Sequence, residues 1–148
     1  GVIHPIKLLE KIKSKLRNTE FIFGEEILNI QTGNNQYSIQ LQTKTISCEK
    51  IFSCLNGFTA DVLSDYKKLI LPQRGQVILT EPLPAFVKGP CYLTKHLCYF
   101  RQLLTGELLV GGFRNHDLES ENTAQDAITD KIQAALNEFT HSYFTNTK

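Results

Sequence analysis

The first half of the chain changes from a helical to a β pattern of apolar positions after about residue 20. Over residues 5–17 apolar side chains recur on one helical face, at Leu8, Leu9, Ile12 and Leu16. Pro5 suits the first helical position, where its missing N–H is not needed. Strand formers dominate residues 27–30, 37–41 and 45–48, and Gly33-Asn34-Asn35 indicates a hairpin between the first two. We therefore predict a helix followed by a small antiparallel meander.

A continuous apolar run, "KIFSCL" (residues 50–55), follows the alternating strands. Such a run is typical of a strand covered on both faces. It leads into Asn56-Gly57 and then into a short helical segment that we predict over residues 59–67.

The second half predicts a sheet and a closing helix. "RGQVILTEPL" (residues 74–83) alternates and ends near a proline, as a strand does when it leaves a sheet. Residues 91–115 predict two or three antiparallel strands with a tight turn at Thr105-Gly106. Residues 122–144 predict an amphipathic helix with a capping-box-like start at Thr123 and Asp126. Its apolar face is Ile128, Ile132, Ala135, Leu136, Phe139 and Tyr143.

This order of elements predicts an α+β fold, with a mixed or antiparallel sheet and flanking helices. The 148 residues suit one domain, or one domain with part of another. The net charge of +1, with both signs intermixed, shows no basic face for nucleic acid. No apolar run approaches the ~20 residues of a membrane span, and no signal peptide opens the chain, so we expect a soluble, cytoplasmic protein. The start at Gly1 and the absence of methionine suggest a fragment or a processed chain.

Four cysteines, Cys48, Cys54, Cys91 and Cys98, lie in strand-like segments. They form no closely spaced pair, and His96 is the only histidine near the second two, so the pattern does not resemble a zinc site. We expect reduced thiols that pack as small apolar groups, and no metal site.

Three places carry candidate chemistry. At Asn56-Gly57 a ligand can approach the backbone closely, although an ordinary turn is the favoured interpretation. In "YFRQL" the alternation places Tyr99 and Arg101 on one face of a strand, where a phenol beside a guanidinium suits a carboxylate. A solvated strand face with a cross-strand partner explains that pair equally well. The third place is "GGFRNHD" with Arg114, for which a polar loop is the favoured interpretation.

Taken together, these segments resemble the middle of the FAD-dependent oxidoreductases of the D-amino-acid oxidase and glycine oxidase superfamily. No single motif is specific, but five occur in the family's order and cover the chain to about Glu121. The segments are "GVIHPIKLLEKIKSKL", "FGEEILNI", "KIFSCLNGFTADVL", "LPQRGQVILTEPLP" and "CYFRQLLTGELLVGGFRN".

The resemblance implies two functional parts. Residues 1–73 would belong to the FAD-binding region, with Ile27 on the adenine side of FAD and with Asn56, Gly57 and His4 near the cofactor. From the residues alone, His4 is better explained as a helix-flanking residue than as a catalytic one.

Residues 74–148 would form the substrate-binding sheet and its C-terminal helix, which are expected to form one compact unit. Tyr99 and Arg101 would orient a small amine or amino-acid substrate, with Arg114 as a weaker candidate. The implied reaction is oxidation of a C–N bond by hydride transfer to flavin.

The chain also departs from the family pattern. It contains neither the GxGxxG turn with its acidic ribose partner nor the family's C-terminal segment. We therefore expect the chain alone to bind FAD weakly and to be inactive, its partners being the missing FAD-binding segments of the same polypeptide. Two alternatives remain: a non-enzymatic small-ligand or partner-binding module, and a tRNA-modifying oxidoreductase of the same superfamily.

Overall fold

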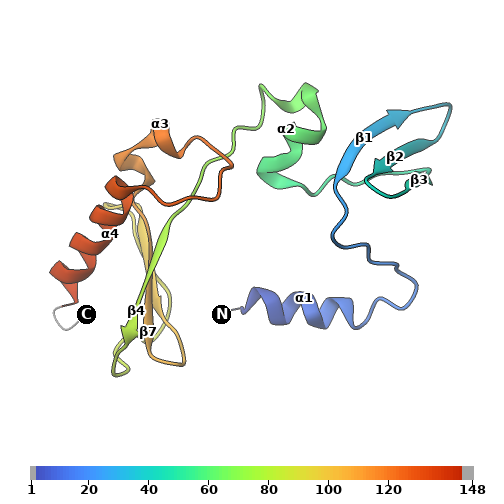
Figure 1. The fold of residues 1–148 in the computed structure, drawn as a ribbon. Coiled ribbons are helices and arrows are strands. Elements are labelled where there is room, and N and C mark those ends of the chain that lie inside the picture. The colour runs from blue at the N-terminus through green and yellow to red at the C-terminus, as the bar shows by residue number, and fades with distance from the viewer. Residues whose placement is uncertain (1–2, 145–148) are drawn as a thin grey trace. The chain divides into compact units, whose positions relative to one another are not determined.

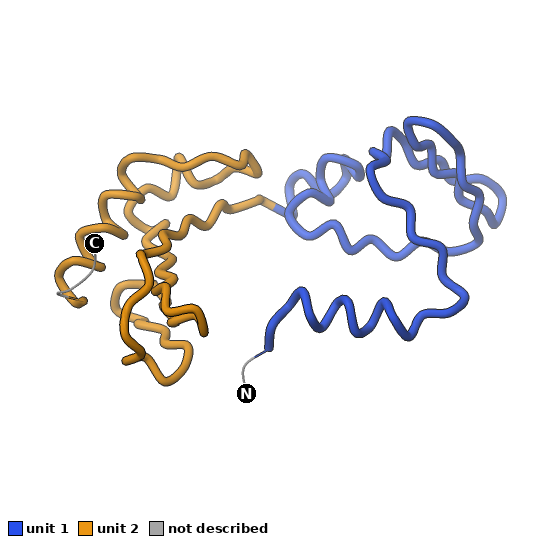
Figure 2. Tube along the Cα trace, turned by 60° about the horizontal axis from the view of Figure 1, so that its bottom comes forward, with its two compact units in different colours: residues 1, 3–70 blue, residues 2, 71–148 orange. Residues whose placement is uncertain are grey.

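The computed structural model describes residues 3–144, which divide into two compact units (Figure 2). Unit 1 comprises Ile3–Ile70, and the described part of unit 2 comprises residues 71–144. Figure 1 labels the main helices and strands of both. Among the described residues no helix is both long and apolar enough to cross a membrane.

Unit 1 begins with helix α1, Pro5–Lys13, which has the predicted proline in its first turn. The helix ends four residues earlier than the pattern predicted. Ser14 is the C-cap, and its hydroxyl donates to the carbonyl oxygen of Lys11 at 2.8 Å. A serine side chain that bonds the backbone locally competes with helix continuation, which accounts for the early end.

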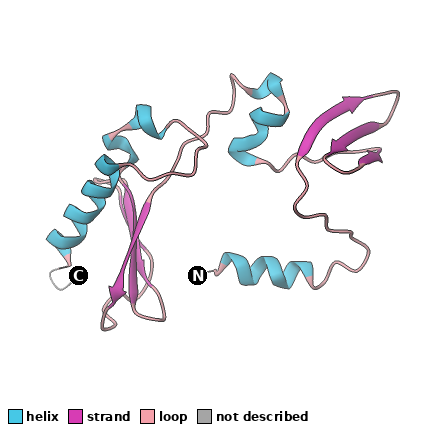
Figure 3. Cartoon of the chain, in the orientation of Figure 1, coloured by secondary structure: helices cyan, strands magenta, loops and turns pink. Residues whose placement is uncertain are grey.

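The predicted meander is confirmed as a three-stranded antiparallel sheet of order β1-β2-β3 (Figure 3). Its strands are β1 Ile27–Thr32, β2 Tyr37–Leu41 and β3 Thr45–Cys48. In the first hairpin the N–H of Gly33 donates to the carbonyl oxygen of Gln36 at 2.8 Å, and Asn35 has a φ of 60°. The turn therefore forms where the glycine and asparagine residues predicted it.

The predicted strand at residues 50–55 is wrong for this structure. The segment belongs to neither sheet, and Phe52 is 87% exposed. A strand needs a neighbouring strand for its backbone hydrogen bonds, and no described residue supplies one here. The apolar run indicates strand propensity, but it does not indicate whether a neighbouring strand is present.

The helix predicted at 59–67 is divided. A 3₁₀ turn at Asn56–Phe58 leads into α2, Thr59–Val62, and a second 3₁₀ turn covers Ser64–Tyr66. Leu63 between them has extended backbone (φ −117°, ψ 90°). With β-branched residues at both ends and no capping side chain, the short segment has little intrinsic tendency to continue as one helix.

Unit 2 contains a four-stranded antiparallel sheet of order β4-β7-β6-β5. Its strands are β4 Val77–Pro82, β5 Cys91–Leu93, β6 Cys98–Gln102 and β7 Glu107–Gly112. The predicted tight turn lies between β6 and β7, where Gly106 has a φ of 108°. The prediction of an α+β fold with an antiparallel sheet is thus confirmed.

Helix α4, Asp130–Tyr143, lies against β4 and β7 and closes the core of unit 2 (Figure 1). A 3₁₀ turn at Arg114–His116 and the short helix α3, Leu118–Glu121, connect the sheet to it. The buried apolar core is Cys98, Leu108, Val110, Phe113, Ile132, Leu136 and Phe139.

The start predicted for this last helix is wrong by several residues. The N-cap is Thr129, not Thr123, and Ile128 lies outside the helix and is 75% exposed. Tyr143 is also mostly exposed. The N–H of Thr129 donates to the side-chain oxygen of Gln76 at 3.0 Å, so a contact from a distant segment fixes the helix start.

Candidate functional site

Within the described part of unit 2, helix α4 covers one face of the sheet, and no helix of the unit covers the other. Phe100, Val110 and Leu108 point into the core against α4. The alternate positions of the same strands form the other face, which we call the open face. Its members are Val77, Leu79, Tyr92, Tyr99, Arg101, Leu109 and Gly111.

The predicted pair Tyr99 and Arg101 lies on this open face. Tyr99 is 40% exposed and is paired across the sheet with Gly111 on one side and Tyr92 on the other. Arg101 is half-buried and is paired with Leu109. Two positions along a strand separate them, a distance of about 7 Å along the backbone.

Both polar groups of this pair are available to a ligand. Within residues 3–144 neither the Tyr99 hydroxyl nor the Arg101 guanidinium has a hydrogen-bond or ion-pair partner. The aliphatic side chains around them, Val77 and Leu79, are about half exposed. A cation and a phenol on an apolar surface are suited to hold a small carboxylate.

The ring of Tyr99 lies across strand β7. A methyl group placed on Gly111 would be 2.5 Å from Cζ and 2.6 Å from Oη of Tyr99. The absence of a side chain at Gly111 therefore leaves the space that the ring occupies.

Arg114 does not lie on the open face. It is exposed in the 3₁₀ turn after β7, where the other polar residues serve the local structure. The Asp117 side chain accepts from the N–H of Ser120 at the start of α3, and the His116 ring packs edge-on against Phe113 at 5.3 Å. These contacts fit a structural loop, and a substrate contact by Arg114 stays a prediction.

The residues predicted to meet FAD all belong to unit 1. His4 is the N-cap of α1, since its Nδ1 accepts from the N–H of Lys7 at 3.4 Å, as expected of a helix-flanking residue. Ile27 is the first residue of β1, against which α2 packs. The role of each of these side chains toward the cofactor stays a prediction.

At the predicted Asn56-Gly57 turn the left-handed residue is Asn56, with a φ of 49°, and not the glycine. Its carbonyl oxygen accepts from the hydroxyl of Thr59 at 2.7 Å. Gly57 lies half-buried inside the 3₁₀ turn, and a close approach of a ligand to its backbone stays a prediction.

A buried polar network in unit 2 was not foreseen from the sequence. Glu121 is 1% exposed and accepts from Arg74 Nε at 3.0 Å and Nη2 at 2.8 Å. It also accepts from Gln76 Nε2 at 2.8 Å and Thr129 Oγ1 at 3.1 Å. The hydrogen bonds from Arg74 lower the pKa of Glu121 to about 2, against the opposing effect of burial. The network is structural, because all its polar atoms bond one another within the unit.

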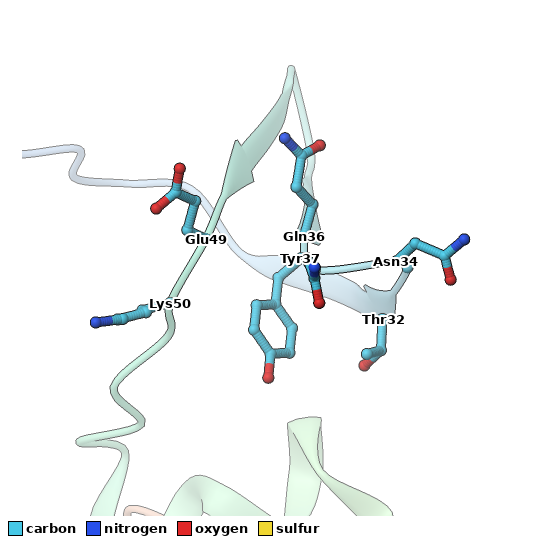
Figure 4. Close-up of a pocket in the computed structure, with 8 residues that line it drawn as sticks. Thr32, Asn34, Gln36, Tyr37, Glu49 and Lys50 are labelled. Carbon is cyan, nitrogen blue, oxygen red and sulfur yellow. The ribbon is translucent and has the colours of Figure 1, made fainter.

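A shallow hollow in unit 1 has a weaker claim to be a site. It is lined by the β1–β2 turn and by Glu49 and Lys50, which follow β3. In Figure 4 the side chains of Glu49 and Lys50 point away from those of Thr32 and Asn34 and do not converge on a common point. Residues 3–144 contain no group of three side chains that could hold a metal ion. Among the cysteines, burial raises the pKa of the Cys98 thiol.

Comparisons with known proteins agree with the resemblance seen in the motifs. The family model described as "DAO: FAD dependent oxidoreductase" matches residues 1–146. The crystal structure of glycine oxidase from Bacillus cereus ATCC 14579 is similar at a TM-score of 0.64 and 14% sequence identity, over 84% of this chain. The chain spans 34% of that protein, and at this identity the likeness concerns the fold. No curated protein sequence matches the chain. The family match shows that the chain belongs to the FAD-dependent oxidoreductase family called DAO.

Proposed function

We propose that this chain supplies the substrate-facing sheet of an oxidoreductase that oxidises the C–N bond of an amine or amino acid. The observation that carries the proposal is the open face, where Tyr99 and Arg101 lie together among apolar side chains. The similar structure is named a glycine oxidase, an enzyme acting on an amino acid, which supports the same class of substrate.

The roles follow from the chemistry of each group. Arg101 would bind the carboxylate of an amino acid through charge-assisted hydrogen bonds, and Tyr99 would fix its orientation. Val77, Leu79 and Leu109 would exclude water around the reacting carbon. When bound, FAD supplies the hydride acceptor, the amine becomes an imine with loss of a proton, and water hydrolyses the imine. A neutral amine needs no general base from the chain for the hydride step.

The residues present fit FAD only in part. The turn at Asn56-Gly57, with Ile27 and His4, would contact the cofactor from unit 1. The described residues include no glycine-rich turn that opens a helix, so they offer no cradle of N–H groups for the pyrophosphate. We therefore propose that further FAD-binding segments of the same polypeptide hold most of the cofactor and that the 148-residue chain alone is inactive.

A flavin experiment tests this proposal directly. FAD is titrated into the 148-residue chain, with fluorescence quenching and thermal shift as readouts, and we expect weak binding or none. The longest polypeptide that the gene encodes is then mixed with FAD and amines without oxygen, and we expect bleaching of the flavin absorbance. Tight FAD binding by the 148-residue chain would refute the partial-site proposal, and bleaching by hydroxy acids but not by amines would refute the substrate class.

Arg101 and Arg114 provide a matched comparison for substrate binding. Glycine is titrated into Arg101→Gln and Arg114→Gln, with NMR chemical shifts of the open face as the readout. We expect Arg101→Gln to lose binding and Arg114→Gln to keep it, because only Arg101 lies on the open face. The reverse result would move the carboxylate site to the loop after β7.

A further inference from the structure

Gly111 and Gly112 are adjacent in sequence but differ in what a side chain would meet. Gly112 has a φ of 124°, and a methyl group there would lie 2.6 Å from the Cα of Cys98. A methyl group on Gly111 would meet the outer end of the Tyr99 ring, with Cζ, Oη and Cε2 as the three nearest atoms. Backbone geometry therefore requires a glycine at 112, whereas at 111 the three nearest atoms all belong to one side chain, that of Tyr99.

The backbone at Gly111 does not itself require glycine. Gly111 lies in β7, pairs with Val77 and Tyr99, and is not among the described residues with a positive φ. A glycine inside a strand weakens the strand, because it loses more conformational freedom on folding and packs no side chain. At Gly111 the missing side chain has a compensating effect, because it leaves the space that the Tyr99 ring occupies.

We propose that Gly111 is a positioning residue of the open face. By bearing no side chain, it lets the Tyr99 ring lie across β7 and keeps the ring out of the space above Arg101. The inference rests on the proposed function, and it adds a limit on the substrate. A Tyr99 ring that lies against β7 leaves room for a small carboxylate ligand beside Arg101. A ring displaced from β7 would fill that room.

The first test measures the ring position without any ligand. The 148-residue chain is labelled with ¹³C in its tyrosine rings, and the Tyr99 signals are assigned by their loss in Tyr99→Phe. We expect nuclear Overhauser effects between the Tyr99 ring and the α protons of Gly111. In Gly111→Ala the Tyr99 signals should shift, with the tyrosine signals from outside the open face and the urea midpoint unchanged. Tyr99 signals that stay in place in Gly111→Ala would overturn the proposal.

A double variant covers the case in which Gly111→Ala does not fold. If the damage comes from the Tyr99 ring, then Gly111→Ala combined with Tyr99→Ala should fold normally. A double variant that also fails to fold would overturn the proposal, because the glycine would then serve the backbone. Gly75→Ala is the matched control, since a methyl group there has nothing within 4 Å.

The second test measures ligand binding and separates the inference from the proposed function. Glycine is titrated into wild type and Gly111→Ala, and we expect the affinity to fall by about tenfold in the variant, as for loss of a hydrogen bond to a charged group. Equal affinities would overturn the positioning role. If the wild type binds no glycine, the proposed function and the ligand part of the inference both fail, and the ring contacts alone decide whether Gly111 seats Tyr99.

Discussion

Replacing Glu121 with glutamine removes a negative charge from the buried polar network of unit 2. The carboxylate joins the segment before β4, through Arg74 and Gln76, to the residue that starts α4, through Thr129. Glutamine has nearly the same shape, but its NH₂ group would face N–H donors and leave Arg74 without its counter-charge. We expect the variant to fold with a lower free energy of unfolding.

The magnitude follows from the pKa of the carboxyl group. The Arg74 hydrogen bonds lower the pKa of Glu121 from its ordinary value of 4.5 to about 2. At ~1.4 kcal/mol for each pH unit, this corresponds to at most ~3.5 kcal/mol of stability. The Arg74 partner keeps part of its side chain in contact with solvent, which screens its charge, so we expect ~1–2 kcal/mol.

The dependence on pH has a definite sign. A carboxyl group whose pKa is lower in the folded state binds protons more readily when unfolded, so its contribution is complete above about 4.5 and is lost as the pH falls toward 2. Urea denaturation at several pH values from 7 to 2 should show the wild type losing ~1–2 kcal/mol more than Glu121→Gln over this range. Glu119→Gln, an exposed change on the same helix, is the control. Parallel pH profiles for wild type and Glu121→Gln would refute the reasoning.

Three further changes test the packing of unit 2. Leu136→Ala should lower the free energy of unfolding by ~2–5 kcal/mol in urea denaturation, because Leu136 is fully buried, whereas Leu104→Ala at an exposed site should change it by under ~0.5 kcal/mol. Gly112→Ala should abolish amide protection of β6 and β7 in hydrogen exchange, since the new methyl group meets backbone, while Gly75→Ala should keep it. Gln102→Ala should speed amide exchange in the loop after β4, whose backbone groups the Gln102 side chain bonds; unchanged exchange would contradict this.

Local patterns predicted the elements whose structure depends on nearby residues. The meander forms at the predicted residues because its turns are two short loops with glycine, asparagine and polar residues, and its strands pair with their sequence neighbours. The same holds for β6 and β7, joined at Thr105-Gly106. Alternation along β6 also placed Tyr99 and Arg101 on one face and Phe100 on the other, as the structure shows.

The features that the sequence did not predict depend on residues far apart in the chain. Arg74 and Glu121 are separated by 47 positions, and nothing in the local pattern marks Glu121 as buried. The same network fixes the start of α4, because Thr129 forms hydrogen bonds with Gln76 and Glu121. Thr123, where the sequence predicted the start, only accepts a hydrogen bond from the nearby N–H of Gln125. The strand predicted at residues 50–55 is wrong because a distant contact is missing. Its strand formers have no pairing partner among the described residues.

The network also separates the motif residues that hold the fold together from those to which we assign a role in the proposed reaction. In "LPQRGQ" the motif residues Arg74 and Gln76 bond Glu121 and the start of α4, so this motif reports how the unit is held together. In "CYFRQ" the residues Tyr99 and Arg101 have no such partners within residues 3–144 and lie on the open face. From the proposed function we therefore expect a change of substrate within this fold to alter the residues of the open face and to leave the Glu121 network in place. Reactivity should accordingly follow substitutions at Tyr99 and Arg101, and stability should follow those at Arg74 and Glu121.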